Sequence, residues 1–330
     1  MILVTGGRGF LGSHLVNHFI SFGRDVRVFD IIGRNCNQAF RTDYVCGDIC
    51  NEGSLNYACR GVDTVIHAAA AVPLSRDEEE IRRVNFDGTK AVYRACQRAG
   101  VRHLVFVSSS AVYGVPWSLP VKTVTRPHPQ EAYGTSKFIT EAFLLWQDIN
   151  EMPKVSIVRP RTIIGPGRLG LFGKLFEWVR QGYPIPVWNK GENVYQFLDV
   201  RDCVRAISFI VKGDIGGRFN LGATSFYTIR DTLQSLIEHA NSKSRIINVP
   251  YALSVKALKL SNRLGLTSFA PYHLLMYGKS FYFDRSAWDN LGIRPTYGNH
   301  TTMSDAYDWY CANREAIEAS SGASAHRSIM

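Results

Sequence analysis

Three glycines near the start of the chain constrain its fold more than any other feature. They directly follow the β-rich run 2–5 and open a segment with helical periodicity. Glycines at this spacing let the amides of a helix N-terminus approach a pyrophosphate, which the helix dipole also favours. The chain is therefore expected to begin with a strand, a turn and a helix that bind a dinucleotide through Gly6, Gly9, Phe10, Leu11 and Gly12.

The first half of the chain alternates short β-rich runs with helical stretches. The expected strands are 2–5, 26–30, 44–46, 64–67, 103–108 and 155–158. The expected helices lie near 10–22, 54–60, 78–99 and 131–149. This order is typical of a doubly wound parallel sheet covered by helices on both faces, so the sequence predicts an α/β Rossmann domain over 1–165.

The second half of the chain breaks this rhythm. Glycine and proline become denser after Pro160, which predicts a smaller, interleaved substrate-binding region over 166–319. Parts of 198–249 still combine helical and strand patterns and are expected to return to the Rossmann sheet. Residues 320–330 are small and polar, and they are expected to form a flexible tail.

Composition excludes several classes of protein. The 330 residues are 45% hydrophobic and 20% charged, which is enough to bury a sizeable core. No apolar window is long enough to cross a bilayer, and no signal region precedes the run 2–5, so a cytoplasmic location is expected. Seven cysteines without paired spacing predict no metal site. The net charge of +10 is spread along the chain, so no nucleic-acid partner is expected, whereas an anionic small molecule and a solvated basic surface both fit.

An acidic residue ends the second expected strand. Asp30 lies eighteen residues after Gly12, where a carboxylate accepts hydrogen bonds from the adenosine ribose and repels a 2′-phosphate. This favours NAD over NADP. Arg34, four residues further on, is most simply a surface residue, although a nearby guanidinium can accommodate the extra phosphate of NADP.

Several motifs occur in order over about the first 170 residues. TGGRGFLG at 5–12 resembles the TGGxGFxG signature of the extended short-chain dehydrogenases, also called the NAD-dependent epimerase/dehydratase family. GDI at 47–49, HAAA at 67–70 and NFDGT at 85–89 resemble three further motifs of that family. The resemblance implies a homodimer through helices 78–99 and 131–149. It also implies cofactor contacts from Asp48, Ile49, Ala68, Ala69, Ala70, Asn85, Ser108, Tyr133, Lys137 and Pro160.

The motif YGTSK at 133–137 begins an expected helix. Tyr133 and Lys137 therefore lie one turn apart on the same face. A lysine ammonium beside a phenol lowers the pKa of the phenol, so that Tyr133 can act as a general base when an alcohol loses hydride to a nicotinamide. Matching Val112 to the family's VYG motif puts Ser109 in the place of the hydroxyl that stabilises the reacting oxygen.

Some positions of this sequence depart from the family's motifs, and these departures narrow the class of substrate. Dehydratases of the family carry an Asp-Glu pair after the catalytic hydroxyl, where this chain has Ser110 and Ala111. The Asn and Arg that hold a sugar nucleotide are replaced by Thr162 and Tyr195. Arg161, Arg168 or Lys190 could supply the lost positive charge, and each fits a solvated surface residue equally well. Substrate contacts are expected from Ser110, Arg161, Thr162, Arg168 and Tyr195.

Later segments resemble the 3β-hydroxysteroid dehydrogenase branch of the family. These are RPRTIIGPG at 159–167, NVYQF at 193–197 and FYFD at 281–284. Between them, the apolar and basic stretch 249–266 fits a core-facing amphipathic helix, and alternatively a lid or a peripheral membrane contact.

Three functions remain open at this point. The first is epimerisation or ketoreduction of a nucleotide-activated sugar, which is favoured because sugar chemistry is the wider use of this architecture. The second is oxidation or reduction of a sterol or another hydrophobic hydroxy or keto lipid. The third is a non-catalytic NAD-binding sensor, and the Tyr133–Lys137 pair argues against it.

Overall fold

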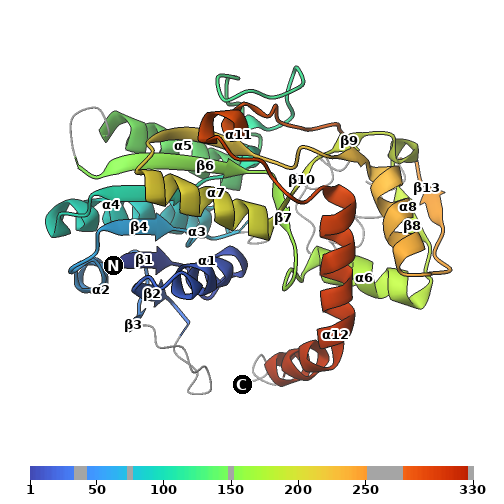
Figure 1. The fold of residues 1–330 in the computed structure, drawn as a ribbon, viewed down its shortest axis with the longest axis horizontal. Helices are drawn as coiled ribbons and strands as arrows, with labels where there is room; N and C mark the ends of the chain where they lie inside the picture. The colour runs from blue at the N-terminus through green and yellow to red at the C-terminus, as the bar shows by residue number, and fades with distance from the viewer. Residues whose placement is uncertain (33–42, 73–76, 148–151, 251–277, 326–330) are drawn as a thin grey trace.

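The computed structural model describes residues 1–32, 43–72, 77–147, 152–250 and 278–325. Its main layer is a seven-stranded parallel sheet with the order β11-β6-β5-β4-β1-β2-β3 (Figure 1). The strands are β1 Ile2–Thr5, β2 Val26–Asp30, β3 Asp43–Cys46, β4 Thr64–His67, β5 His103–Val107, β6 Lys154–Pro160 and β11 Gly217–Leu221. The order around β1 is that of a Rossmann sheet, which confirms the predicted α/β class.

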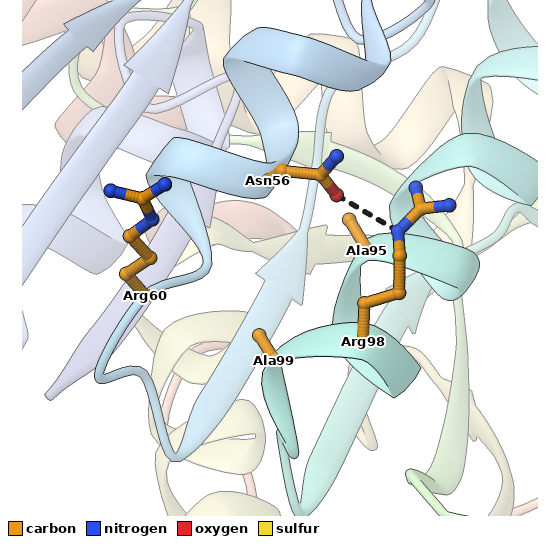
Figure 2. A pocket seen from close by; sticks show the side chains of 5 residues that line it. All are labelled: Asn56, Arg60, Ala95, Arg98 and Ala99. Carbon is orange, nitrogen blue, oxygen red and sulfur yellow. Dashed lines mark hydrogen bonds between the residues drawn. The ribbon is translucent and has the colours of Figure 1, made fainter.

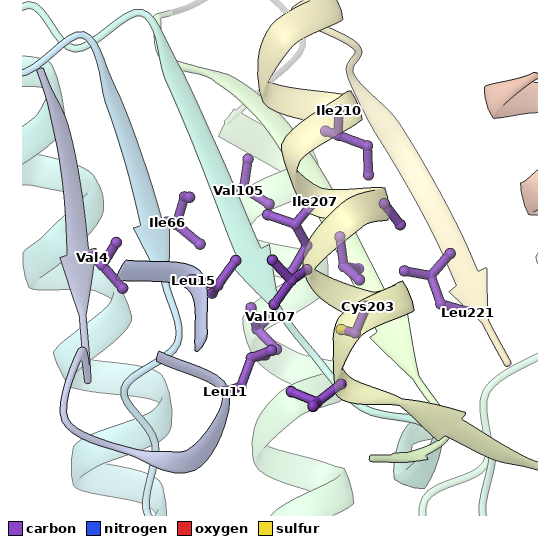
Figure 3. Packing of buried hydrophobic residues seen from close by; sticks show 14 of the residues in the cluster. Val4, Leu11, Leu15, Ile66, Val105, Val107, Cys203, Ile207, Ile210 and Leu221 are labelled. Atoms are coloured by element: carbon purple, nitrogen blue, oxygen red, sulfur yellow. The ribbon is translucent and has the colours of Figure 1, made fainter. Parts of the chain in front are cut away.

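Helices cover both faces of this sheet. They are α1 Phe10–Ser21, α2 Glu52–Ala58, α3 Glu78–Arg82, α4 Gly88–Ala99, α5 Ala132–Gln147 and α7 Val200–Gly213. On one face, Leu15 of α1 and Ile207 of α7 pack with Val4 and Val105 of the sheet (Figure 3). On the other face, side chains of α2, α4 and α5 pack against strand residues such as Leu104. The central strands β1, β4 and β5 are buried along their whole length, as their continuous apolar runs require.

Two helix boundaries differ from the sequence expectation. The expected helix 78–99 is interrupted by the π-helical turn η1, Arg83–Asp87, which joins α3 to α4. Such turns add a residue to a helix and are frequent at functional sites. Helix α2 begins two residues before the expected position 54, because the Asn51 side chain accepts a hydrogen bond from the Ser54 amide and caps it.

A second group of elements lies at one end of the sheet (Figure 1). Its strands form three pairs: β7 Thr162–Ile164 with β10 Phe197–Asp199, β9 Val194–Tyr195 with β12 Tyr227–Thr228, and β8 Ile185–Val187 with β13 Ile246–Asn248. Its helices are α6 Leu171–Gln181, α8 Ile229–His239 and α12 Asn299–Ala325. The short helix α11 Ser286–Leu291 packs instead against α7 and against β11 of the main sheet (Figure 1). Residues of α6, α8 and α12 share one hydrophobic core, which includes Phe176, Leu233 and Tyr307.

The structure agrees only in part with the organisation that the sequence predicted for the second half of the chain. Of the range 198–249, β11 joins the main sheet beside β6, whereas β12 and β13 pair with β9 and β8. Helix α12 extends to Ala325, into the range 320–330 that the sequence assigned to a tail. The preceding run ANREAIEA at 312–319 is rich in strong helix formers, so the helix continues past it. Apart from its first two residues, the amphipathic stretch 249–266 lies outside the described residues.

None of the helices in the described ranges is both long enough and apolar enough to cross a membrane.

Candidate active site

The glycine loop lies between β1 and α1, where the strand order of the sheet reverses. Gly6 has a φ of +67°, and a Cβ atom there would lie 2.7 Å from the Cα of Ala69. A Cβ on Gly12 would lie 2.0 Å from the carbonyl oxygen of Gly6. Gly9 caps α1 without any side-chain hydrogen bond to the first helical amides. This tight turn and the uncapped amides fit a pyrophosphate, which the helix N-terminus would bind.

Asp30 lies at the carboxyl end of β2 beside this loop. Its Oδ2 accepts a hydrogen bond from the Arg8 amide at 2.9 Å, and its Oδ1 accepts one from the Ile32 amide at 3.1 Å. The Arg8 side chain binds the Tyr44 hydroxyl, and burial together with Asp30 raises the pKa of Tyr44. Arg8 is therefore a cation beside Asp30 that the sequence analysis did not single out, although it lies within the glycine motif. Arg34 lies outside the described residues.

Asp48 and Ile49, two of the expected cofactor contacts, are held in place by neighbouring residues of the protein. Asp48 Oδ1 accepts a hydrogen bond from the Cys50 amide at 2.9 Å, and its Oδ2 accepts one from Arg83 at 3.1 Å. These bonds lower the pKa of Asp48 against the opposing effect of burial. Ile49 is buried against Gly88, where a Cβ atom would come within 2.8 Å of the isoleucine side chain.

A buried hydrogen-bond chain connects the glycine loop to η1. His67 bonds Thr5 through Nδ1 at 2.6 Å and Thr89 through Nε2 at 2.9 Å. Thr89 in turn donates to the backbone oxygen of Asn85 at 2.7 Å. Burial lowers the pKa of His67 to about 3, so its ring is neutral. The ring therefore acts as a fixed connector rather than as a proton carrier.

Asn85 extends this chain to the catalytic helix. Its side-chain amide donates to Ser136 Oγ at 3.0 Å and to the Ala71 carbonyl at 3.0 Å, and its oxygen accepts from the Ala71 amide at 2.8 Å. Ser136 donates to the backbone oxygen of Tyr133 at 2.7 Å. Ala68, Ala69 and Ala70 lie between β4 and this segment. Thr89 and Ser136 were not singled out individually, although both lie within the motifs that carry the family resemblance.

Tyr133 and Lys137 both lie on α5, as expected. Lys137 is buried, and its Nζ donates to the Val107 carbonyl at 2.9 Å and lies 4.6 Å from the ring centroid of Phe106. Desolvation raises the pKa of Tyr133 to about 12 and lowers that of Lys137 to about 7. The net pKa of Tyr133 is thus raised, whereas the sequence predicted a lowered value. The reason is that Nζ bonds β5, 5.9 Å from the tyrosine ring centroid, while desolvation of the phenol dominates.

Three consecutive serines follow β5 and have different partners. Ser109 accepts a hydrogen bond from the Ala111 amide at 3.1 Å and bonds the Tyr133 hydroxyl. Ser108 donates to Glu141 instead, and Ser110 accepts from Arg161 at 2.9 Å. Of the three, Ser109 is thus the serine that meets Tyr133, in the register that the family motif gave.

The proposed substrate residues follow β6. Pro160 pairs with Leu221 at the end of that strand. Thr162 Oγ1 and the Tyr195 hydroxyl bond each other at 3.0 Å. Arg161 is 3% exposed, and its guanidinium carbon lies 4.6 Å from the ring centroid of Tyr195 and 3.9 Å from that of Phe281.

The two remaining candidate cations lie in different surroundings. The Arg168 guanidinium lies 5.2 Å from the ring centroid of Phe10 in the glycine loop, and its charge acts to lower the pKa of Tyr133. Lys190 is exposed in the short helix η3, Asn189–Gly191, and its amide donates to Asn248 at 2.9 Å. Arg168 therefore borders the site around Tyr133, and Lys190 has no described contact with it.

A separate pocket lies between α2 and α4 (Figure 2). It is lined by Asn56, Arg60, Ala95, Arg98 and Ala99. Arg98 Nε donates to Asn56 at 3.0 Å. None of the candidate site residues lines this pocket.

Comparison with known proteins identifies the same family as the sequence motifs. A sequence model of the NAD dependent epimerase/dehydratase family matches residues 2–222. The chain belongs to the NAD-dependent epimerase/dehydratase family. As a member, it is an enzyme of the extended short-chain dehydrogenase type.

Two relatives and one solved structure are similar to this chain over most of its length. The protein y4nG of Sinorhizobium fredii is 38% identical, over 98% of this chain and 82% of its own length. The sterol-4-alpha-carboxylate 3-dehydrogenase, decarboxylating, of Mus musculus is 29% identical, over 92% of this chain and 88% of its own. The crystal structure of UDP-glucose 4-epimerase from Thermotoga maritima matches with a TM-score of 0.79 at 22% identity, covering 96% of this chain and 99% of the epimerase. At this identity, the structural likeness concerns the fold alone.

Proposed function

We propose that the protein interconverts a secondary alcohol and a ketone on a hydrophobic, steroid-like substrate, with NAD as hydride carrier. Bound NAD would supply the hydride acceptor when the alcohol is oxidised, and its reduced form the hydride donor when the ketone is reduced. The uncapped amides of α1 would hold its pyrophosphate, and Asp30 would accept hydrogen bonds from its adenosine ribose. Residues 1–165 with β11 would form the NAD-binding part, and the rest of 166–319 mainly the substrate-binding part.

Three side chains would carry the chemistry. Tyr133 takes the proton of the substrate hydroxyl in oxidation and returns it in reduction. Ser109, already bonded to the Tyr133 hydroxyl, donates to the reacting oxygen and stabilises the charge that develops there. Lys137 lies one helical turn from Tyr133, with its Nζ anchored to the Val107 carbonyl, and would orient the ribose hydroxyls of the cofactor.

The single observation that best supports a steroid-like substrate is the hydrogen bond between Thr162 and Tyr195, at 3.0 Å. These residues occupy the positions where the resemblance expects the sugar and diphosphate anchors of nucleotide-sugar enzymes, and their hydroxyls satisfy each other. The aromatic rings of Tyr195 and Phe281 lie beside them, stacked on the Arg161 guanidinium. The name of the mouse relative, a sterol dehydrogenase, supports the same class. This reverses the order of the two substrates that the sequence favoured.

A nucleotide-activated sugar, processed by 4-epimerisation or ketoreduction, is the second candidate. Arg168 favours it, because this guanidinium borders both the glycine loop and Tyr133 and could bind a phosphate.

The test is a substrate screen of the purified protein with NAD. We would follow NADH formation and thermal stabilisation with 3β-hydroxysteroids on one side and with uridine and thymidine diphosphate sugars on the other. NADH formation with steroids, and no stabilisation by nucleotide diphosphates, is the expected result. Stabilisation by uridine diphosphate alone as well as by its sugar would support the second candidate instead.

We also propose that the protein is a homodimer through α4 and α5. Trp146 on α5 is 77% exposed, and Phe86 packs edge-on against Phe143 on the same side, with ring centroids 6.2 Å apart. An exposed aromatic beside such a cluster is typical of a subunit interface. Sedimentation of the wild type and of a Trp146→Glu variant tests this, because only a dimer through α5 dissociates upon that change.

A further inference from the structure

Two very exposed hydrophobic side chains lie on one segment next to the candidate active site. Among the large hydrophobic side chains of the described residues, Trp117 and Val124 have the highest exposed fractions, 88% and 83%. Both belong to residues 115–130, which connect the short helix η2, Ser110–Tyr113, to α5. In Figure 1 this connection is the teal-green loop that projects at the top of the molecule, beside α11. Single exposed hydrophobic residues are ordinary, but two on one projecting segment indicate a contact surface.

The exposed residues of this segment form one face. From Lys122 to His128, residues alternate between exposed and partly buried, as in an extended chain whose side chains point to opposite sides. The exposed ones are Lys122, Val124, Arg126 and His128. The Trp117 ring lies edge-on to that of His128, with ring centroids 5.9 Å apart, so it extends the same face. These five residues are called the Trp117 face below.

The backbone of the segment is held in place at both ends of the alternating stretch. Val121 is fully buried, its amide donates to the Tyr282 carbonyl at 2.9 Å, and its carbonyl accepts from the Asp284 amide at 3.2 Å. The His128 amide donates to the Val112 carbonyl at 3.0 Å. The Trp117 face is therefore presented by an anchored segment, which loses little conformational entropy when it binds a partner.

The formal charge of the segment is positive. Residues 115–130 include Lys122 and Arg126 but no aspartate or glutamate. Asp284, on the segment that pairs with Val121, accepts a hydrogen bond from the Ser286 hydroxyl at 2.8 Å through its carboxylate. Exposed cations beside an exposed indole suit an anionic bilayer, because tryptophan lies in the interface while basic side chains attract the charged headgroups.

We propose that the Trp117 face binds the surface of an anionic lipid bilayer as a peripheral contact. The segment that carries it ends at Glu131, whose carboxylate accepts hydrogen bonds from the Tyr133 amide at 2.7 Å and the Gly134 amide at 2.5 Å. A membrane contact here would place the start of the catalytic helix beside the phase in which a hydrophobic substrate dissolves. That consequence rests on the proposed function, whereas the lipid contact itself does not.

The experiment measures co-sedimentation of the protein, supplied with NAD, with two kinds of lipid vesicle. One is made of phosphatidylcholine, and the other is an equal mixture of phosphatidylcholine and phosphatidylserine. The test variants are Trp117→Ser and the double variant Lys122→Gln/Arg126→Gln. The thermal transition and NAD binding of each variant show that it is folded.

Two control variants change matched residues outside the segment. Phe22→Ser removes an aromatic side chain that is 72% exposed at the end of α1. Lys212→Gln/Arg218→Gln removes two exposed cations, one on α7 and one on β11. These controls separate the Trp117 face from general effects of surface charge and exposed hydrophobic groups.

The wild type should bind the mixed vesicles more tightly than phosphatidylcholine alone, and added salt should weaken that binding. Lys122→Gln/Arg126→Gln should lower the affinity for the mixed vesicles about 30-fold, because each basic residue near an anionic surface contributes about fivefold. Trp117→Ser should lower it about tenfold, since the indole no longer enters the interface. Both controls should bind as the wild type does.

Three results would overturn the lipid contact and leave the proposed function standing. The first is a wild type that does not bind the mixed vesicles, or test variants that bind them equally well. The second is an equal loss in Lys212→Gln/Arg218→Gln, which would assign the attraction to the net charge of +10 as a whole. The third is a changed oligomeric state of Trp117→Ser in sedimentation without lipid, which would show that a second copy of the chain covers this face. Failure of the substrate screen would refute the proposed function alone, because vesicle binding requires no turnover.

Discussion

Glu141 and Arg159 form a bidentate ion pair in the protein core, behind the candidate active site. Arg159 Nε lies 2.9 Å from one carboxylate oxygen and 3.1 Å from the other, and the two side chains are 2% and 1% exposed. Ser108 donates to the carboxylate, and Arg159 Nη1 donates to Tyr113 at 2.6 Å. The pair therefore joins α5, which carries Tyr133, to β6, which leads to Arg161.

Removal of one partner from this pair should be costly. Glu141→Gln leaves the Arg159 guanidinium buried without a counter-charge, and we expect the free energy of unfolding to fall by about 3–5 kcal/mol. Asp289→Asn is the control, since it breaks the exposed pair with Arg285 and should cost at most about 1 kcal/mol. Urea unfolding measures both. Equal losses in the two variants would contradict a structural role for the buried pair.

Tyr133→Phe should separate cofactor binding from turnover. It removes the hydroxyl that exchanges the proton and leaves the ring in place, so kcat should fall by about 100-fold or more. NAD affinity, measured by calorimetry, should change by less than about tenfold, because only the expected contact of the Tyr133 hydroxyl is lost and the pyrophosphate contacts remain. Tyr57→Phe changes an exposed tyrosine and should leave both quantities unchanged. A Tyr133→Phe variant that retained most of its kcat would exclude Tyr133 as the general base.

Lys137 should make the stability of the cofactor-free protein depend on pH. Burial lowers its pKa to about 7 from the ordinary value of 10.5. Between these values the unfolded chain holds a proton that the folded chain releases, so stability should rise from pH 7 to about pH 10. Tyr133 acts in the opposite direction only above pH 10, because its pKa is raised.

The measurement is the thermal midpoint of three proteins between pH 7 and pH 10. Lys137→Met should lose much of the rise that the wild type has over this range, whereas Lys212→Met, at an exposed position, should keep it. An identical pH profile for Lys137→Met and the wild type would mean that the buried amine does not titrate in this window.

Local sequence patterns predicted the features that depend on residues close together in the chain. The strand 2–5 with its glycine loop is one, and the Tyr133–Lys137 pair on one helix is another, because both follow from fixed spacing. The partner of Lys137 was not predictable in this way, since Val107 lies thirty residues earlier on β5. The same holds for Arg161, whose stacking partner Phe281 comes from a distant part of the chain. Burial, which dominates the pKa of Tyr133, is likewise set by packing rather than by local sequence.

Asp30 and Arg8 together should set the choice between NAD and NADP. The Asp30 carboxylate is fixed by the Arg8 and Ile32 amides, and we propose that it favours NAD by binding the ribose and repelling a 2′-phosphate. Asp30→Ser removes the repulsion, and the Arg8 guanidinium, which bonds Tyr44 nearby, would then attract the phosphate.

We therefore expect Asp30→Ser to lower kcat/KM for NAD and to raise it for NADP, each by about tenfold, the ratio that about 1.4 kcal/mol produces. The double variant Asp30→Ser/Arg8→Ala is the decisive control, since it should lose the gain for NADP but keep the loss for NAD. If the double variant still uses NADP as well as the single one does, the cation that accepts the phosphate is not Arg8. If Asp30→Ser leaves the preference for NAD intact, the choice of cofactor does not depend on this carboxylate.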